Sequence, residues 1–285
     1  MTPHVSAPPT IFDRAARRTR RDRAAANYPA HDFLRAAMID GLLDRLAMVR
    51  REFTAVLDLG CFDGTLSVPE GARSVGCDAG FQFARRAGGV QADEDRLPFA
   101  DASFDLVVSA GVLDQVDDLP GALALIRRVL RPDGLFLGAF VGAGSLPILR
   151  ASLRSAEAER PVARLHPGVE VRAAGDLMLR AGFALPVADV EALEVGYAGI
   201  GGLLDDLRGT AEGNVMVQRR ALGRGALTRA AEAFAASAGP DGRTREHVSL
   251  VFVTGWAPDP SQPLPARRGS ATASLAATLA RQRSG

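Results

Sequence analysis

The stretch T-A-V-L-D-L-G-C-F-D-G, residues 54–64, decides the fold. It reads as an apolar strand that runs into a turn with a glycine at each end, Gly60 and Gly64. Glycine has no Cβ, so the backbone N–H groups of such a turn can approach a bound ligand closely. Tight turns also need glycine for structural reasons, and the pair alone does not specify nucleotide binding.

Further short β-rich runs follow at intervals that suit helices. Runs that are apolar throughout indicate parallel strands buried on both faces and joined by right-handed crossovers. The sequence therefore predicts an α/β fold built on a Rossmann-like, doubly wound sheet. The expected strands after the first are residues 74–78, 89–92, 104–110 and 134–140.

Acidic residues follow two of these strands. Asp78 closes the second strand, and a carboxylate at that edge, beside the first turn, can accept hydrogen bonds from both hydroxyls of a ribose. Asp78 could equally cap the helix expected near Phe81. Asp93 follows the third strand. Taken in this order, the strand-end residues favour a nucleotide site.

The remaining chain is divided by composition and hydrophobic periodicity. Apolar residues recur at helical spacing before the first strand and again in the segment that precedes the last strand, which we expect to form a helical cap. The expected units are a flexible tail (1–10), an N-terminal helical segment (11–52), a core (53–196), a helical cap (197–245), the last strand (246–257) and a C-terminal tail (258–285).

The N-terminal helical segment carries a basic face. Arginines recur there at spacings of three and four, which is one side of a helix. This face could be simply solvated, or it could dock an acidic partner or lipid headgroups and so make a peripheral membrane contact. The arginines of this face are Arg14, Arg17, Arg18 and Arg21, widened by Arg20 and Arg23.

Composition limits the functions to consider. The 34 basic and 33 acidic residues leave a formal charge of +1, so no nucleic-acid partner is expected. Cys61 and Cys77 are poor material for a disulfide framework or a zinc site and suit a reducing cytoplasm. No apolar run is long enough for a transmembrane segment.

The motif L-P-F-A-D-A-S-F-D-L-V-V (97–108), followed by L-R-P-D-G-L-F (130–136), resembles class I S-adenosylmethionine-dependent methyltransferases. The resemblance covers residues 50–140 and implies a seven-stranded sheet with S-adenosylmethionine as cofactor. The contacts that it implies are Asp78 to the ribose, Asp93 and the backbone of Glu94 to the adenine, Asp58, Gly60 and Gly64 around the methionine end, and Ser109.

A narrower resemblance extends along nearly the whole chain. The segments I-F-D-R (11–14), V-D-D-L-P-G-A-L (116–123), G-D-L-M-L-R-A-G-F (175–183) and D-L-R-G (206–209) are similar to the methyltransferase-like assembly factors of respiratory complex I. That family is thought to hydroxylate an arginine of a complex I subunit. The biotin-pathway malonyl-acyl-carrier-protein O-methyltransferases are a more distant relation and imply a small carboxylic acid as substrate.

The chain departs from the superfamily pattern at the site. Phe62 stands where the turn usually has a third glycine, and Pro69 limits the helix expected after it. The His-Trp pair of the family is replaced by Asp114 and Gln115, which become the catalytic candidates. If the reaction is a hydroxylation, Asp114 and Glu94 could hold a guanidinium.

No catalytic signature is needed for methyl transfer, because the cofactor carries the activated group and the protein need only align the nucleophile. The histidines are scattered without metal-ligand spacing, and we expect no metal site. His166, beside Pro167, could be a substrate-side residue or a surface residue. The histidines of the chain are His4, His31, His166 and His247.

Two functional hypotheses follow. The first is an S-adenosylmethionine-dependent methyltransferase, or a related arginine hydroxylase, that acts on a protein or small acid with the cap as a lid. The second is a cofactor-poor binding module or assembly chaperone with a degenerate pocket. A nicotinamide-dependent oxidoreductase is disfavoured because the turn is not G-x-G-x-x-G.

Overall fold

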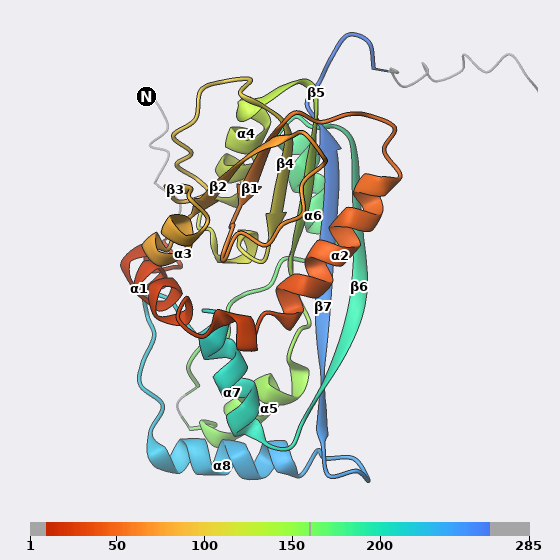
Figure 1. Ribbon diagram of the computed structural model, residues 1–285. Coiled ribbons are helices and arrows are strands. Elements are labelled where there is room, and N and C mark those ends of the chain that lie inside the picture. The colour runs from red at the N-terminus through yellow and green to blue at the C-terminus, as the bar shows by residue number, and fades with distance from the viewer. Residues whose placement is uncertain (1–9, 160, 263–285) are drawn as a thin grey trace, which may run out of the picture.

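The computed structural model describes residues 10–159 and 161–262, so most of both predicted tails lies outside the described residues. Seven strands form one sheet in the order β3-β2-β1-β4-β5-β7-β6 (Figure 1). β1 to β5 pair in parallel, whereas β7 is antiparallel to both β5 and β6. The predicted α/β sheet is confirmed. Its strands are β1 Ala55–Leu59, β2 Arg73–Asp78, β3 Val90–Gln91, β4 Phe104–Ala110, β5 Leu130–Val141, β6 Ala184–Tyr197 and β7 Thr244–Trp256.

Helices cover both faces of the sheet. α2 packs Met38 and Leu42 against one face, where they meet Leu106 and Phe252. α3, α4 and α6 contribute to the core of the other face. The helices are α1 Arg14–Ala24, α2 Phe33–Ala47, α3 Phe81–Arg86, α4 Leu119–Val129, α5 Pro147–Ala156, α6 Val171–Arg180, α7 Ile200–Gly209 and α8 Arg224–Ala235, with 3₁₀ turns η1 Tyr28–Ala30 and η2 Leu113–Gln115.

Local chemistry accounts for several of these boundaries. All seven residues of β4 are buried, as expected for a central parallel strand covered on both faces. α4 begins at the N-cap Asp118, whose side chain accepts a hydrogen bond from the N–H of Gly121 at 2.9 Å. α6 ends before Gly182, whose φ of +84° is a left-handed conformation that favours glycine, so the predicted stop is confirmed.

The segment between β1 and β2 differs from the prediction. A short helix was expected after Gly64, but residues 61–72, all of them described, contain only turns and irregular backbone. Pro69 has no N–H to donate, and Gly71 adopts φ +79°, so a helix gains little here. The structure therefore lacks a helix dipole directed at the turn Gly60–Gly64.

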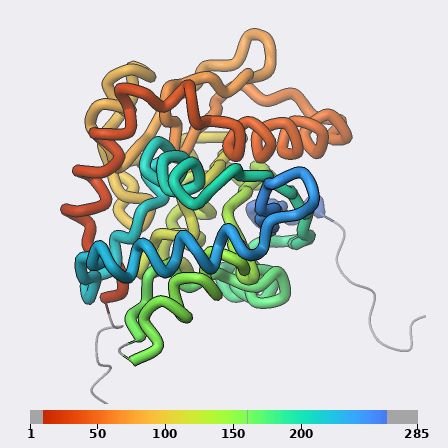
Figure 2. Tube along the Cα trace, turned by 90° about the horizontal axis from the view of Figure 1, so that it is seen from below, coloured from red at the N-terminus to blue at the C-terminus, as the bar shows by residue number. Residues whose placement is uncertain are grey.

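α5, α7 and α8 form a separate helical lobe beyond the end of the sheet (Figure 1). α8 lies across this end of the molecule, against α5 (Figure 2), and Leu149, Leu153, Leu203 and Phe234 are buried between the lobe helices. The long strands β6 and β7 run from the sheet down to the lobe (Figure 1). Residues 161–170 lead from the lobe to α6, and residues 210–223 join α7 to α8.

In the part of the chain that the structure describes, no helix combines the length and apolar character needed to cross a membrane. Cys61 and Cys77 are both buried free thiols. Burial raises the pKa of both thiols, so they are poor nucleophiles and pack as small apolar side chains.

Candidate active site

The turn Gly60–Gly64 follows β1 at the edge of the sheet where nucleotides are expected. Gly60 and Gly64 have φ of +80° and +77°, and a Cβ on Gly60 would collide with Val112. Phe62, between them, also has a positive φ, +48°, and its side chain is buried. Its ring stacks on Tyr28 at 4.8 Å and meets Phe83 edge-on at 5.1 Å. An aromatic ring thus fills the middle of the turn.

Asp78 lies fully buried at the end of β2, as predicted, but its oxygens are already occupied. Arg21 of α1 donates two hydrogen bonds to it, at 2.8 Å and 2.5 Å. The N–H groups of Phe62 and Gly80 add bonds at 3.1 Å and 2.7 Å. The guanidinium of Arg21 also lies 4.1 Å from the centre of the Phe62 ring. Arg21 therefore sits where a ribose was expected.

The other predicted adenosine contacts are taken by the same helix. Arg17 donates two hydrogen bonds to Glu94, at 2.6 Å and 2.8 Å, and both side chains are buried. Asp93 pairs with Arg18 at 2.7 Å and with Arg14 at 3.3 Å. These are charge-assisted pairs, and three arginines bind their carboxylate through two hydrogen bonds each: Arg17 with Glu94, Arg18 with Asp93 and Arg21 with Asp78. We call Asp78, Asp93, Glu94 and the turn Gly60–Gly64 the closed nucleotide site.

Both interpretations of the basic face are wrong for the arginines at its centre. Arg17 and Arg21 are buried and pair with the protein's own carboxylates, whereas Arg14 and Arg18 pair with carboxylates but remain partly exposed to solvent. The complementary run is D-E-D, residues 93–95, with which three of the four arginines pair. Helical spacing identified which arginines share a face but not which way that face turns.

Two further predicted contacts lie beside the closed nucleotide site. Asp58 is buried, and its contact with the guanidinium of Arg35 is long, at 3.5 Å. Burial raises the pKa of Asp58 to about 6. Ser109, in β4, is fully buried, and its hydroxyl has no hydrogen-bond partner among the described residues.

These residues, as arranged here, do not fit S-adenosylmethionine. The cofactor's ribose would need the oxygens of Asp78, which Arg21 occupies. The ring of Phe62 fills the centre of the turn, and Arg17 covers Glu94. Asp78, Asp93 and Glu94 stand at the expected strand ends, but arginines of α1 already occupy their oxygens.

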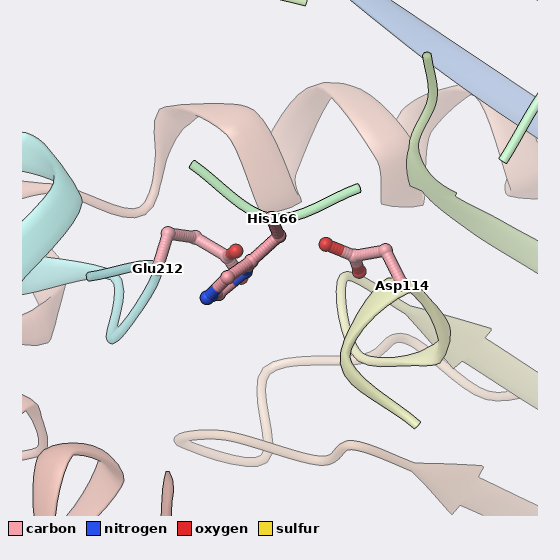
Figure 3. Close-up of side chains that lie close together, drawn as sticks. All are labelled: Asp114, His166 and Glu212. Atoms are coloured by element: carbon pink, nitrogen blue, oxygen red, sulfur yellow. The ribbon is translucent and has the colours of Figure 1, made fainter. Parts of the chain in front are cut away.

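A second group of titratable residues lies at a cavity of about 70 Å³ between the sheet and the helical lobe. Asp114 comes from η2 after β4, His166 from the connection before α6, and Glu212 from the connection after α7. Their side chains point toward one another (Figure 3), with one ligand atom from each all within 4.8 Å. We call these three residues the Asp-His-Glu cluster.

The two carboxylates of the cluster are poorly satisfied. Asp114 is 8% exposed, and its Oδ1 has no hydrogen-bond partner in the described part of the chain. Glu212 accepts one hydrogen bond, from Gln115 Nε2 at 2.6 Å. Burial raises the pKa of Asp114, and burial followed by the nearby charge of Asp114 raises the pKa of Glu212. The cluster therefore holds negative charge at a cost that a cation would relieve.

His166 is held in place from two sides. Its Nε2 accepts a hydrogen bond from the N–H of Val215 at 3.1 Å, and its ring meets Phe12 edge-on at 5.2 Å. Burial, then the charges of Arg20, Arg17 and Arg150, lowers its pKa to about 4. The imidazole is therefore neutral at neutral pH and available as a ligand or a hydrogen-bonding group.

The sequence identified part of this cavity. Asp114 and Gln115 were predicted as candidates; Asp114 lines the cavity, and Gln115 lies beside it and donates a hydrogen bond to Glu212. The expected pair of Asp114 with Glu94 is not free to hold a substrate guanidinium, because Glu94 already pairs with Arg17. Glu212 was missed. The three cluster residues are far apart in sequence and lie on separate connections, so no local motif signals them.

Comparison with known proteins identifies the family of the chain. Residues 57–138 match the family model described as "Methyltransferase domain". The chain is 35% identical to the mitochondrial arginine hydroxylase NDUFAF5 of Danio rerio, over 93% of this chain and 88% of that protein. It is 33% identical to the malonyl-acyl-carrier-protein O-methyltransferase of Methylovorus, over 90% and 93%. Among solved structures, the phosphoethanolamine N-methyltransferase 2 of Haemonchus contortus with S-adenosyl-L-methionine shares the fold at 16% identity, with a TM-score of 0.51 over 85% of this chain and 60% of that one.

Proposed function

This chain belongs to the family that contains the arginine hydroxylase NDUFAF5 and malonyl-acyl-carrier-protein O-methyltransferase, proteins with the class I methyltransferase fold, and from that premise we propose that it is an enzyme that modifies an arginine side chain of a protein partner. The reaction takes place at the cavity of the Asp-His-Glu cluster. The closed nucleotide site serves mainly to hold α1 on the core.

One observation carries this assignment of the reaction to the cavity. The fold has two groups of carboxylates near the same edge of the sheet, and of these two groups, within the described residues, only Asp114 and Glu212 of the Asp-His-Glu cluster form no ion pair. Negative charge favours a cationic side chain over an acidic substrate. Apolar side chains of the walls, among them Phe33, Leu165 and Leu207, would pack along the methylene stem of an arginine and exclude water.

The partner is proposed from the family resemblance. We take it to be a subunit of respiratory complex I, met in the bacterial cytoplasm, where two buried free thiols are at home. Helix α1 offers no free basic face for a membrane, because its central arginines are paired internally.

The test is mass spectrometry of complex I subunits. Arginine-containing peptides would be compared between a strain that lacks this protein and the same strain carrying either the wild type or Glu212→Gln. We expect an arginine that gains one oxygen atom with the wild type and not with Glu212→Gln. Subunits whose arginines are the same in all three strains would refute the proposal.

Methyl transfer is the second candidate, favoured by the similarity to an O-methyltransferase. It requires S-adenosylmethionine to reach Asp58, Gly60, Gly64, Asp78, Asp93, Glu94 and Ser109, and so requires α1 to leave. Calorimetric titration separates the two candidates, with Asp78→Ala as the control. Micromolar binding that Asp78→Ala abolishes would support methyl transfer, and no heat at millimolar ligand would end it.

A further inference from the structure

The Asp-His-Glu cluster has features that binding of an arginine side chain alone leaves unused. It joins a neutral imidazole to two carboxylates, with one ligand atom from each within 4.8 Å of the others. Asp114 is more than nine-tenths buried, and its Oδ1 has no hydrogen-bond partner among the described residues. Figure 3 shows the carboxylate of Asp114 directed toward His166 and Glu212. A buried polar atom without a partner calls for a ligand.

We propose that Asp114, His166 and Glu212 bind a divalent first-row transition-metal ion of the iron or manganese type. Two carboxylates balance the charge of the ion, and mixed nitrogen and oxygen ligands suit these metals. Three protein ligands leave coordination positions open for water or substrate. The proposal deepens the proposed function, on which its catalytic meaning rests, because hydroxylation of an arginine requires a metal or an organic redox cofactor.

The histidine argues that the cluster itself binds an ion, with the substrate guanidinium beside it in the same cavity. A guanidinium offers only N–H donors, and it can pair with Asp114 and Glu212 without any help from an imidazole. A metal ion uses all three side chains. The site is also small, about 70 Å³, which is several times the roughly 10–15 Å³ that one water molecule needs and enough for an ion with its remaining waters.

The geometry requires only local adjustment. Ligand atoms about 2.1 Å from an ion lie about 3 Å apart when adjacent, so the side chains must close by an ångström or two from their present spacing. His166 Nε2 accepts a hydrogen bond from the N–H of Val215, so the metal-free ring carries its proton on Nδ1. On binding the ion, Nε2 exchanges this hydrogen bond for the bond to the metal, and the ring keeps the tautomer with the proton on Nδ1.

Gln115 is the supporting residue of this site. Its Nε2 donates to Glu212 at 2.6 Å and orients that carboxylate, while its own Oε1 is buried without a partner among the described residues. Residues that orient ligands in this way typically contribute about 10–100-fold to metal affinity. Gln115 is therefore a positioning residue for Glu212.

The experiment titrates the full chain with Mn²⁺ in the absence of any substrate, by calorimetry and by electron paramagnetic resonance. The variants are His166→Gln and Glu212→Gln. The matched control is Asp206→Asn, because Asp206 lines the same cavity but pairs with His31 at 2.8 Å. We expect one Mn²⁺ per chain for the wild type and the control. Each cluster variant should bind at least about 10–100-fold more weakly.

A second measurement guards against misfolding. In the metal-free protein, Glu212→Gln should leave the midpoint of thermal unfolding close to that of the wild type, because Gln keeps the shape of the side chain, so weaker Mn²⁺ binding cannot be blamed on an unfolded variant. No binding by the wild type at millimolar Mn²⁺, or equal binding by all variants, overturns the proposal. Binding of L-arginine methyl ester in place of Mn²⁺, dependent on Glu212, would overturn the metal site and leave the proposed function standing.

Discussion

The two carboxylate groups at the edge of the sheet differ in one respect. In the closed nucleotide site, Asp78 and Glu94 each receive a bidentate arginine from α1. In the Asp-His-Glu cluster, Asp114 and Glu212 share a cavity with a neutral histidine and no arginine within hydrogen-bonding distance in the described chain. The residues expected to bind the cofactor form an internal ion-pair network in this structure, whereas the carboxylates of the cavity form no ion pair within the described residues.

This difference has an energetic side. A buried carboxylate is tolerated when it is paired and hydrogen-bonded, and it is costly when it is not. Asp78 makes four hydrogen bonds, so the closed nucleotide site gives up little by staying closed. Asp114 leaves one oxygen unsatisfied, which is the usual signature of a functional group held ready for a ligand.

Removal of Arg21 should have the largest effect of the changes that test this difference. Arg21→Ala leaves Asp78 buried without its counter-ion, and we expect the free energy of unfolding to fall by about 3–5 kcal/mol in urea denaturation. The double variant Arg21→Met with Asp78→Asn should recover much of this loss, because no charge is left unpaired. Arg23→Ala, at an exposed position of the same helix, is the control and should change stability by less than about 0.5 kcal/mol. A loss no larger than that of Arg23→Ala would show that the network is not structural.

The next largest effect is on activity. Glu212→Gln keeps the shape of the side chain but removes the charge, and we expect arginine modification to fall about 30-fold or more, since loss of one partner of a buried charge pair costs 2–5 kcal/mol. Arginine modification would be followed on a partner peptide by mass spectrometry, with Asp206→Asn as the control. An equal loss in both variants would mean that the cavity wall matters and the cluster does not.

Asp58 offers a smaller, pH-dependent test, because it is intermediate between the two groups: buried, but only loosely paired with Arg35. Its folded pKa of about 6 lies above the ordinary value of 3.8, so the folded protein holds the proton more tightly, and the contribution of Asp58 to stability falls as pH rises from 4 to 6. Asp58→Asn should therefore gain about 2–3 kcal/mol relative to the wild type at pH 7.5, and nearly nothing at pH 4. Urea denaturation at both pH values measures this; a difference between the two proteins that does not change with pH contradicts it.

The sheet could be predicted from the sequence because burial on both faces leaves a continuous apolar run, as in β4. The end of α6 could be predicted because Gly182 marks it directly. The order of strand-end residues also located Asp78 correctly. What occupies Asp78 could not be predicted, since the pairing with Arg21 joins residues 57 positions apart. Periodicity groups residues on a helix face, but it does not say what that face packs against.

Less of the candidate site than of the fold could be predicted from the sequence. Asp114 and Gln115 became candidates because they stand in place of the His-Trp pair of the family. His166 and Glu212 lie on irregular connections, whose course is set by the packing of the helical lobe and not by a local pattern. The metal site that we propose is assembled in this way and follows no spacing rule, so the sequence alone does not predict it.

The smallest effect concerns Phe62, which both fills the turn and lies under the guanidinium of Arg21 at 4.1 Å. If the ring helps to hold the closed nucleotide site, the variants Phe62→Leu and Arg21→Met should not be additive. A double-mutant cycle on the free energy of unfolding should give a coupling of about 0.5–2 kcal/mol, the range of a cation–π contact away from water. Phe83, whose ring is 5.2 Å from the same guanidinium, provides the matched comparison and should couple more weakly because it is farther away. Zero coupling for Phe62 would make it a space-filling residue only, and the closure of the site would then rest on the arginine–carboxylate pairs alone.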